Sequence, residues 1–356
     1  MTEKPLILVI NPGSTSTKIA LYKGEEPYKE LDITHSAADL AGFGNNLEQL
    51  DFRFAAVEKA LADWGCKPSD LKAAIGRGGP LKPLSGGVYH VGESLMNDLQ
   101  SGKLVDHASI LGGLIACRVA KTAKIPAFIA DPVSVDEFDD IARISGYPEI
   151  PRISLSHALN IKSVVAEVAR EDGKKPEDVN YIVAHLGGGI SIAAHRKGRQ
   201  VDVNNANDAG PFSPERCGTL PLGGLLKMAF SGKYTMNELK KQLVGKGGLV
   251  AHLGTSDCRE VVKRIEAGDA KAKLVLEAMA YTIAKEIGAM ATVLKGEIDA
   301  IILTGGIAQN PYVVRCITER VSFLAPVRMK PGQNELKALA AHACRALAEP
   351  AIVKEY

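Results

Sequence analysis

The sequence lacks three features that would each point to a particular class of protein. It has no strong excess of one charge, since 43 Lys and Arg residues against 41 Asp and Glu residues leave a formal net charge of +2. Proteins that coat nucleic acids usually carry a marked basic excess, so no nucleic-acid partner is expected. No apolar run reaches the roughly 20 residues that a membrane-spanning helix needs, so no membrane partner is expected. The first residues lead into a strand-length apolar run without the core or cleavage site of a signal peptide.

Closely spaced cysteines are also missing. The six cysteines stand at 66, 117, 217, 258, 316 and 344, and no CxxC pair occurs. This excludes the usual zinc-knuckle and thioredoxin patterns. Scattered cysteines in a chain of this length are typical of buried thiols in a reducing compartment, so we expect a cytoplasmic protein.

What the sequence does have is a globular composition and many glycines. Its 356 residues are enough for two ordinary domains, and 46% of them are hydrophobic, which excludes wholesale disorder. Many of the 35 glycines stand in short clusters between apolar runs. Such clusters are typical of loops whose backbone approaches a phosphate.

An internal repeat divides the chain near its middle. Residues 6–24 align without a gap with residues 180–198, so that Gly13 falls on Gly187 and Lys23-Gly24 falls on Lys197-Gly198. Each copy has the pattern of an apolar strand, a tight turn of small residues, a second strand and a Lys-Gly turn into a third. Chance similarity between two glycine-rich hairpins is the alternative to a duplication.

Between and after the repeats, helical and strand patterns alternate. Alternating strands and helices favour an α/β fold with a mostly parallel sheet and a hairpin at the start of each repeat. The spacing predicts helices at 52–63, 107–121, 157–171, 270–294, 310–323 and 334–348, and strands at 71–75, 127–130 and 300–303.

Three glycine-rich turns follow predicted strands, at 11–18, 185–189 and 304–310. The first is not a Walker A loop, because a strand and not a helix follows Lys18. The third leads into a helix, whose N-terminus would favour an anion or a nucleotide edge. Each turn alone could be a tight turn that only serves packing, but three together favour phosphate binding.

With these motifs, the chain resembles the acetate/butyrate kinase family of the actin-like ATPase superfold. The resemblance runs from Ile7 to about Ala348 and rests on the stretches 10–18, 76–83, 185–191, 208–221 and 303–307. The Arg77-Gly78-Gly79 form and the short length look closer to butyrate kinases than to acetate kinases. The resemblance implies a duplicated α/β fold, actin-like and ribonuclease H-like, with two lobes around a central cleft. Lobe I would be 1–150, completed by a C-terminal helix at 336–356, and lobe II would be 151–335.

The resemblance also implies a reaction and its active site. ATP and a short-chain fatty acid, butyrate in the first place, would give ADP and an acyl phosphate by in-line, Mg²⁺-assisted phosphoryl transfer. Two anions must then meet, so cations and a metal must offset their repulsion. The residues that match the family's catalytic positions are Arg77, His157, Arg216, Glu335, Asn11 and Asp131, of which Asn11, Glu335 and Asp131 match those near the metal.

The remaining matched positions concern the nucleotide and the acid. Those for the nucleotide and its phosphates are Ser14, Ser16, Lys18, His185, Gly187, Gly188, Gly189, Asp257, Arg259, Gly305, Gly306, Ile307 and Asn310. Gly78, Gly79 and His107 match the substrate pocket. Acetate kinases carry a bulkier apolar residue at the place of Gly79, so this glycine either enlarges the acyl pocket or serves only a tight turn. The second histidine that acetate kinases have after the first is absent from His157-Ala-Leu-Asn160.

Several alternatives stay open. The acid could be acetate, propionate or a branched-chain acid, and a sugar kinase is a weaker alternative. A non-catalytic actin-like nucleotide-binding module is a different class of function, although such a module would not need a carboxylate clamp. Family members usually pair through the second lobe, so we expect a homodimer or an assembly of dimers. The sequence does not give the physiological direction of the reaction.

Overall fold

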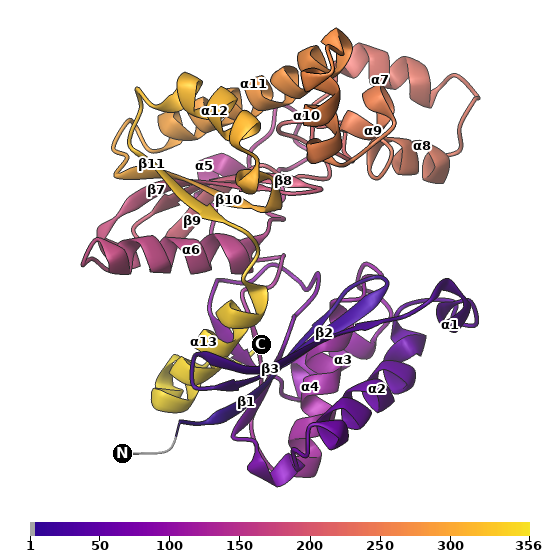
Figure 1. The fold of residues 1–356 in the computed structure, drawn as a ribbon, viewed down its shortest axis with the longest axis vertical. Helices are drawn as coiled ribbons and strands as arrows, with labels where there is room; N and C mark the ends of the chain where they lie inside the picture. Colours follow the sequence, from indigo (N-terminus) through magenta and orange to yellow (C-terminus); the bar gives the residue numbers. More distant parts are fainter. Residues whose placement is uncertain (1–3) are drawn as a thin grey trace. The chain divides into compact units, whose positions relative to one another are not determined.

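The structure is a computed structural model that describes residues 4–356. The chain forms two compact units (Figure 1). The first holds the chain up to Val135 together with Asn334–Tyr356, and the second holds Asp136–Gln333. The lobe limits expected from the sequence, 1–150 with the C-terminal helix at 336–356 and 151–335, remain a prediction.

The first unit is built on a six-stranded sheet. Its order is β3-β2-β1-β4-β6-β5; β2 pairs antiparallel with β1 and β3, whereas β1, β4 and β6 are parallel. The strands are β1 (Leu6–Pro12), β2 (Ser16–Lys23), β3 (Glu26–Thr34), β4 (Ala73–Gly76), β5 (Val88–His90) and β6 (Ala127–Ala130). The helices are α1 (Ala37–Leu40), η1 (Leu47–Gln49), α2 (Leu50–Asp63), η2 (Pro68–Asp70), α3 (Glu93–Gln100), α4 (Ile110–Ala123), α13 (Glu335–Ala348) and η5 (Pro350–Ile352).

Helices cover both faces of this sheet, because apolar side chains along β1 point alternately to one face and the other. Leu8 and Ile10 of β1 pack into one core with α2, α3 and α4. The C-terminal helix α13 packs on the other face, against β1 and β4 (Figure 1). Because successive strand residues point to opposite faces, the buried apolar stretch 7–10 of β1 packs against a core on each side.

The second unit has a five-stranded sheet of order β11-β10-β7-β8-β9. Ile182 and Ala184 pack with α11 and α12 on one face, and Tyr181 and Val183 pack with α6 on the other (Figure 1). The strands are β7 (Asn180–Leu186), β8 (Ile190–Arg196), β9 (Arg199–Val203), β10 (Ala300–Gly305) and β11 (Val327–Pro331). The helices are α5 (Asp140–Arg143), α6 (Ala158–Glu171), η3 (Pro176–Asp178), α7 (Leu222–Ala229), α8 (Met236–Leu243), α9 (Gly248–Leu253), α10 (Cys258–Glu266), α11 (Ala270–Val293), η4 (Gly306–Gln309) and α12 (Pro311–Val321).

The two sheets repeat one topology, which confirms the predicted duplication. In each unit a three-stranded meander, β1-β2-β3 or β7-β8-β9, begins the sheet, and its first strand pairs in parallel with a later strand, β4 or β10. β1 and β7 occupy the aligned positions of the sequence repeat, 6–12 and 180–186. The predicted helices and strands are all present, although the one expected at 107–121 begins only at Ile110. The side chain of Ser109 bonds to His107 there, which holds 107–109 in a turn.

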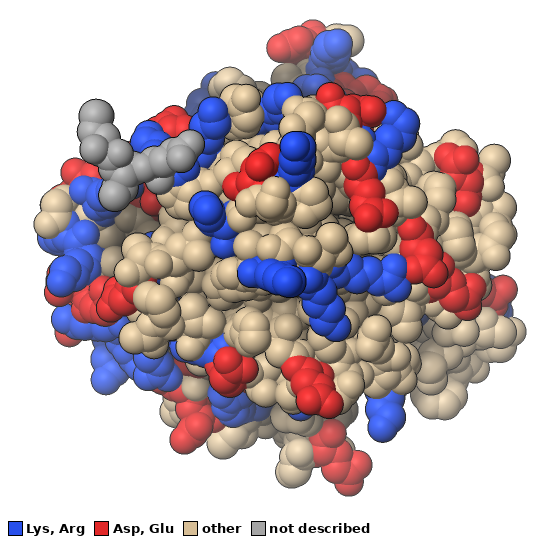
Figure 2. All heavy atoms as spheres, turned by 90° about the horizontal axis from the view of Figure 1, so that it is seen from below, with Lys and Arg blue, Asp and Glu red and all other residues tan. Residues whose placement is uncertain are grey.

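The surface matches the balanced composition. Acidic and basic side chains are interspersed on the face drawn in Figure 2. No helix within residues 4–356 has the length and the apolar composition needed to cross a membrane.

Candidate functional site

In the first unit, three of the predicted site residues stand where neighbouring parallel strands end. Asn11 lies near the end of β1, Arg77 follows β4 and Asp131 follows β6. Ile10 pairs with Gly76, and Gly76 pairs with Ile129, so the strands end at one edge of the sheet. Polar groups at the carboxyl ends of parallel strands are typical of ligand sites in open α/β sheets.

Glu335 joins two of these residues from the start of α13. One of its carboxylate oxygens forms an ion pair with the Arg77 guanidinium, and the other accepts a hydrogen bond from the Asn11 amide at 2.8 Å. The side chains of Arg77 and Glu335 are only 12% and 17% exposed. Arg77, Asn11 and Glu335 therefore form one cluster, although 324 residues separate Asn11 from Glu335.

Asp131 has different surroundings. Its Oδ1 accepts a hydrogen bond from the backbone N–H of Gly87 at 2.6 Å, and its Oδ2 lies 2.9 Å from Nε2 of His342 on α13. The carboxylate is buried, with 1% of the side chain exposed. Both oxygens are thus engaged by protein groups, and a metal role for Asp131 stays a prediction.

Packing between α4 and β4 fixes the backbone of Arg77. Gly76 and Gly112 meet so closely that a Cβ on Gly112 would lie 2.6 Å from the Arg77 nitrogen, and the Gly113 N–H donates to the Arg77 carbonyl at 3.1 Å. The close approach of these glycines was not predicted from the sequence. Their signal is Gly112-Gly113 inside a helical pattern, where glycine is unfavourable unless a close approach requires it.

We expect Gly112→Ala to destabilise the protein by about 1–3 kcal/mol, the usual cost of overpacking, and to lower activity by displacing Arg77. Gly288→Ala is the matched control, since Gly288 lies in helix α11 and a Cβ there would meet no atom within 4 Å beyond its own helix backbone. That change should stabilise the helix by up to about 1 kcal/mol. Urea unfolding measures both variants. Equal stabilities would show that the crossing at Gly112 is not tight.

Gly78 and Gly79 follow Arg77 in a packed turn. Gly79 has a φ of 74°, and a Cβ there would lie 3.0 Å from the backbone nitrogen of Ile110. A Cβ on Gly78 would lie 2.8 Å from Cδ1 of Ile129. A side chain at either position would be strained, which favours the turn interpretation of Gly79 over an enlarged acyl pocket. His107 lies at the start of the segment that contains Ile110, and its Nδ1 is 2.6 Å from the Ser109 hydroxyl.

The first glycine-rich loop of this unit is a hairpin turn between β1 and β2. Ser14 is exposed and Ser16 is half-buried. Lys18 is half exposed on β2 and forms an ion pair with Asp32 across the sheet at 3.7 Å. Lys18 therefore has a structural partner, and its contact with a phosphate stays a prediction.

In the second unit, two of the predicted histidines stack on each other. The rings of His157 and His185 are 3.9 Å apart and within 10° of parallel. His157 precedes α6 and its Nδ1 lies 3.0 Å from the Ser191 hydroxyl of β8. The His157 ring is therefore oriented both by the stack and by a hydrogen bond.

His185 is a fully buried residue of β7. Its Nδ1 is 2.7 Å from Oδ1 of Asn160, and its Nε2 is 3.2 Å from the amide nitrogen of Gln333. Because Oδ1 of Asn160 accepts and the Gln333 amide nitrogen donates, these two contacts fit a donor at Nδ1 and an acceptor at Nε2. His185 thus supports His157, and its predicted contact with a phosphate stays a prediction.

The second glycine-rich loop, 187–189, is contacted by residues of the stretch 213–216. Ser213 donates to the Gly188 carbonyl, and a Cβ on Gly189 would lie 2.6 Å from Cζ of Arg216. The Arg216 guanidinium therefore occupies the space where any other residue at 189 would have its side chain. Burial lowers the pKa of Arg216, and Glu215 partly opposes that shift. A partly buried cation held against a glycine loop is suited to a phosphoryl group.

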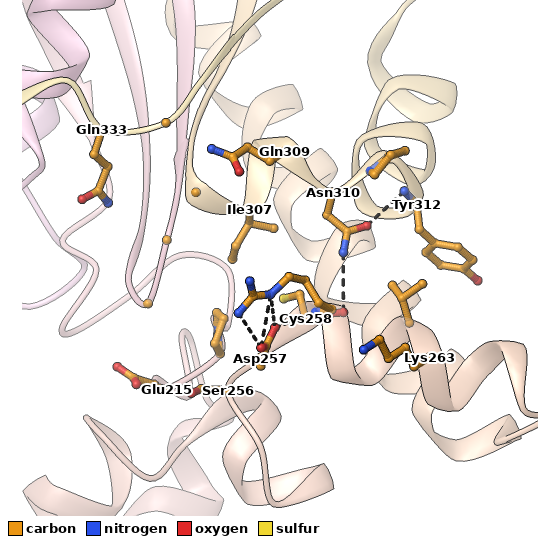
Figure 3. Close-up of a pocket in the computed structure, with 18 of the residues that line it drawn as sticks. Glu215, Ser256, Asp257, Cys258, Lys263, Ile307, Gln309, Asn310, Tyr312 and Gln333 are labelled. Atoms are coloured by element: carbon orange, nitrogen blue, oxygen red, sulfur yellow. Dashed lines mark hydrogen bonds and ion pairs between the residues drawn. The ribbon is translucent and has the colours of Figure 1, made fainter.

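One cavity of about 1290 Å³ brings the second and third glycine-rich turns together (Figure 3). Of the second-unit residues predicted for the nucleotide, His185, Gly189 and Gly305 are not in its lining, although Gly189 and Gly305 directly adjoin residues that are. The predicted residues that line it are Gly187, Gly188, Asp257, Arg259, Gly306, Ile307 and Asn310.

Helix starts shape the wall of this cavity. Asp257 caps α10, and the Asn310 side chain caps α12 by accepting a hydrogen bond from the N–H group of Tyr312 (Figure 3). Asn310 also accepts a hydrogen bond from the N–H group of Val313. The ion pair with Arg259 lowers the pKa of Asp257 to about 2. Burial raises the pKa of the Cys258 thiol to about 11, so this cysteine of the cavity is not a thiolate nucleophile at neutral pH.

No cluster of three or more His, Cys, Asp or Glu side chains that could hold a metal ion occurs within residues 4–356. A divalent cation that binds together with a nucleotide also takes ligands from the phosphate oxygens. This is the usual way in which Mg²⁺ binds together with a nucleotide.

Comparison with known proteins identifies the family and the fold. The family model of the acetokinase family matches residues 155–342. The chain is 54% identical over 341 residues to the "Probable butyrate kinase 2" of Caldanaerobacter subterraneus subsp. tengcongensis, with 96% of each chain covered. Among solved structures, the acetate kinase of Porphyromonas gingivalis matches with a TM-score of 0.77 and 18% identity over 96% of this chain and 100% of that one. The propionate kinase of Francisella tularensis subsp. tularensis matches with a TM-score of 0.73 and 18% identity over 95% and 98%. The chain therefore belongs to the acetokinase family of carboxylate kinases and has its actin-like α/β fold.

Proposed function

We propose that this protein transfers the γ-phosphoryl group of ATP to the carboxylate of butyrate, giving ADP and butyryl phosphate. The binding of ATP is supported mainly by the cavity of the second unit. This cavity combines the loop 187–189 with the turn at 306–310 and two helix starts. Glycine loops and helix N-termini both favour phosphate groups.

The choice of butyrate rests on the relative at 54% identity, which is named a probable butyrate kinase. The solved acetate and propionate kinases support the fold and not the acid, since each is only 18% identical. Gly79 does not decide the chain length of the acid, because the backbone itself requires glycine there. The acid therefore has to be identified by experiment.

The reaction requires positive charge at the place where the new bond forms. A carboxylate attacking ATP brings two anions together, and their repulsion has to be offset where the new bond forms. We assign the carboxylate to Arg77, whose guanidinium can bind both oxygens of an acid. We assign the transferring group to Arg216, which lies against the loop 187–189, and to His157, which is held by Ser191 of β8 and the ring of His185. A phosphoryl group in transfer carries its charge on three equatorial oxygens, which such donors can stabilise.

Glu335 and Asn11 carry the kinds of oxygen atom that bind Mg²⁺. The Asn11 amide nitrogen donates to Oε2 of Glu335 at 2.8 Å and the Arg77 guanidinium pairs with Oε1, so a Mg²⁺ ion would share the Glu335 carboxylate with these two donors. Carboxylate and amide oxygens are the hard ligands that Mg²⁺ prefers. A bound ion would neutralise charge on the ATP phosphates. Glu335 also holds Arg77, so it links the binding of the acid to that of the nucleotide.

The assembly state and the location stay predictions. We expect a homodimer or an assembly of dimers in the cytoplasm. Size-exclusion chromatography with light scattering measures the assembly directly.

The direct test is to trap the acyl phosphate with hydroxylamine. The protein is incubated with Mg·ATP and acetate, propionate, butyrate or isobutyrate, and the hydroxamate is measured at several acid concentrations. We expect hydroxamate with all the short-chain acids and the highest kcat/KM with butyrate. A clear preference for acetate would overturn the choice of acid. Binding of ATP without any hydroxamate would favour a non-catalytic nucleotide-binding module.

A further inference from the structure

A buried arginine lies behind the first glycine-rich loop. Arg53, in the first turn of α2, is 0% exposed. Its Nη1 donates to the carbonyl oxygens of Gly13 and Ser16, each at 2.8 Å, and its Nη2 donates to that of Ser14 at 3.0 Å. A single guanidinium therefore holds almost every carbonyl of the loop.

Neutral groups take up the rest of its donors. Nε and Nη2 donate to the Gln49 side-chain oxygen at 2.9 and 2.8 Å, and Nη1 also reaches the Thr17 hydroxyl at 3.0 Å. Burial lowers the pKa of Arg53, but a guanidinium remains charged at neutral pH. No carboxylate forms an ion pair with Arg53 within residues 4–356. A buried cation without a counter-ion is costly, so its presence calls for a reason beyond packing.

The direction of the peptide groups supplies that reason. In a trans peptide the C=O of one residue and the N–H of the next point in opposite directions. Since the carbonyls of Gly13 and Ser14 point at Arg53, the N–H groups of Ser14 and Thr15 point away from it. Ser14 and Thr15 are exposed, and within the described chain neither N–H donates to a protein acceptor. The loop therefore presents free donors on one side and a fixed positive charge on the other.

We propose that Arg53 is a positioning residue that holds the loop 13–16 in its phosphate-binding form, and that its charge adds to the attraction for the terminal phosphates of ATP. This inference rests on the proposed function only in taking the ligand to be ATP. Arg53 does not touch the ligand, because its five N–H donors are all used within the protein.

The test compares Arg53→Met, which removes the charge and the donors, with Arg53→Lys, which keeps the charge and fewer donors. Calorimetry measures the binding of the β,γ-imido analogue of ATP with Mg²⁺, and of adenosine, to each variant. We expect Arg53→Met to lower the affinity for the analogue by about 10- to 100-fold, which is the effect of losing one or two charge-assisted interactions. Adenosine should bind to Arg53→Met as it does to the unchanged protein. The affinity of Arg53→Lys for the analogue should lie between those of Arg53→Met and the unchanged protein.

Leu61→Ala controls for a general loss of stability, since Leu61 is a core residue of the same helix α2 and is 4% exposed. It should lower the melting temperature without changing the affinity for the analogue. If Arg53→Met behaves like Leu61→Ala, or if both Arg53 variants bind the analogue like the unchanged protein, Arg53 is merely structural. These binding results do not depend on turnover, so they are separate from a failure of the hydroxamate assay, which would overturn the proposed function instead.

Discussion

Arg216→Gln is expected to lower kcat with butyrate by about a thousandfold, the scale at which arginines act in phosphoryl transfer. The Arg216 guanidinium lies against Gly189 in the loop that lines the nucleotide cavity. Glutamine keeps the local fold, because the hydrogen bonds of Arg216 with Ser213 involve the Arg216 backbone. Hydroxamate formation under saturating ATP measures the effect.

Arg259→Gln is the matched control for this change. Arg259 lines the same cavity, but its side chain is 85% exposed and it pairs with Asp257. Ion pairs that are exposed to water contribute little energy, so this variant should raise the KM for ATP by a small factor and leave kcat almost unchanged. A kcat for Arg216→Gln within tenfold of the unchanged protein would contradict the role given to Arg216.

Glu335→Gln is expected to lower kcat by about a hundredfold and to raise the Mg²⁺ concentration needed for half-maximal activity. The substitution keeps the shape of the side chain but removes the charge that holds Arg77 and the oxygen offered to the metal. Leaving Arg77 without its partner should also cost about 1–3 kcal/mol of stability. Initial rates over a Mg²⁺ series, together with urea unfolding, measure these effects.

Glu349→Gln provides the comparison, because Glu349 is exposed at the opposite end of the same helix α13. It should change neither the rate nor the Mg²⁺ dependence. A Glu335→Gln variant with reduced kcat and an unchanged Mg²⁺ requirement would mean that Glu335 serves Arg77 alone. Unchanged kcat would remove Glu335 from the active site altogether.

The sequence predicted the parts of the fold that short-range patterns encode. The repeat at 6–24 and 180–198 anticipated the two meanders, because alternating apolar residues and tight turns act locally. The long helix at 270–294 was equally visible from its periodicity and appears as α11, Ala270–Val293. The exposed pair α7 and α8 was not predicted, and neither helix buries a residue in the described structure.

What could not be predicted are contacts between distant segments. Arg53 looks like an ordinary surface residue of an amphipathic helix, and only the tertiary fold brings it to the loop 37–40 residues earlier. Asn160 belongs to the segment that lacks the second histidine of acetate kinases, yet it supports His185 from α6. The position of His185 within a strand gave no sign that both ring nitrogens would be engaged. Such partners are fixed by packing, which a local pattern does not contain.

Arg77 and Arg216 are each assigned a part in the phosphorylation of the acid, and the most direct test is the rate of butyryl hydroxamate formation by Arg77→Gln and by Arg216→Gln beside the unchanged protein. The account predicts that each variant alone loses at least about a hundredfold in kcat/KM, with Arg77→Gln raising the KM for butyrate and Arg216→Gln acting mainly on kcat. If both variants form butyryl hydroxamate at nearly the rate of the unchanged protein, the account is wrong.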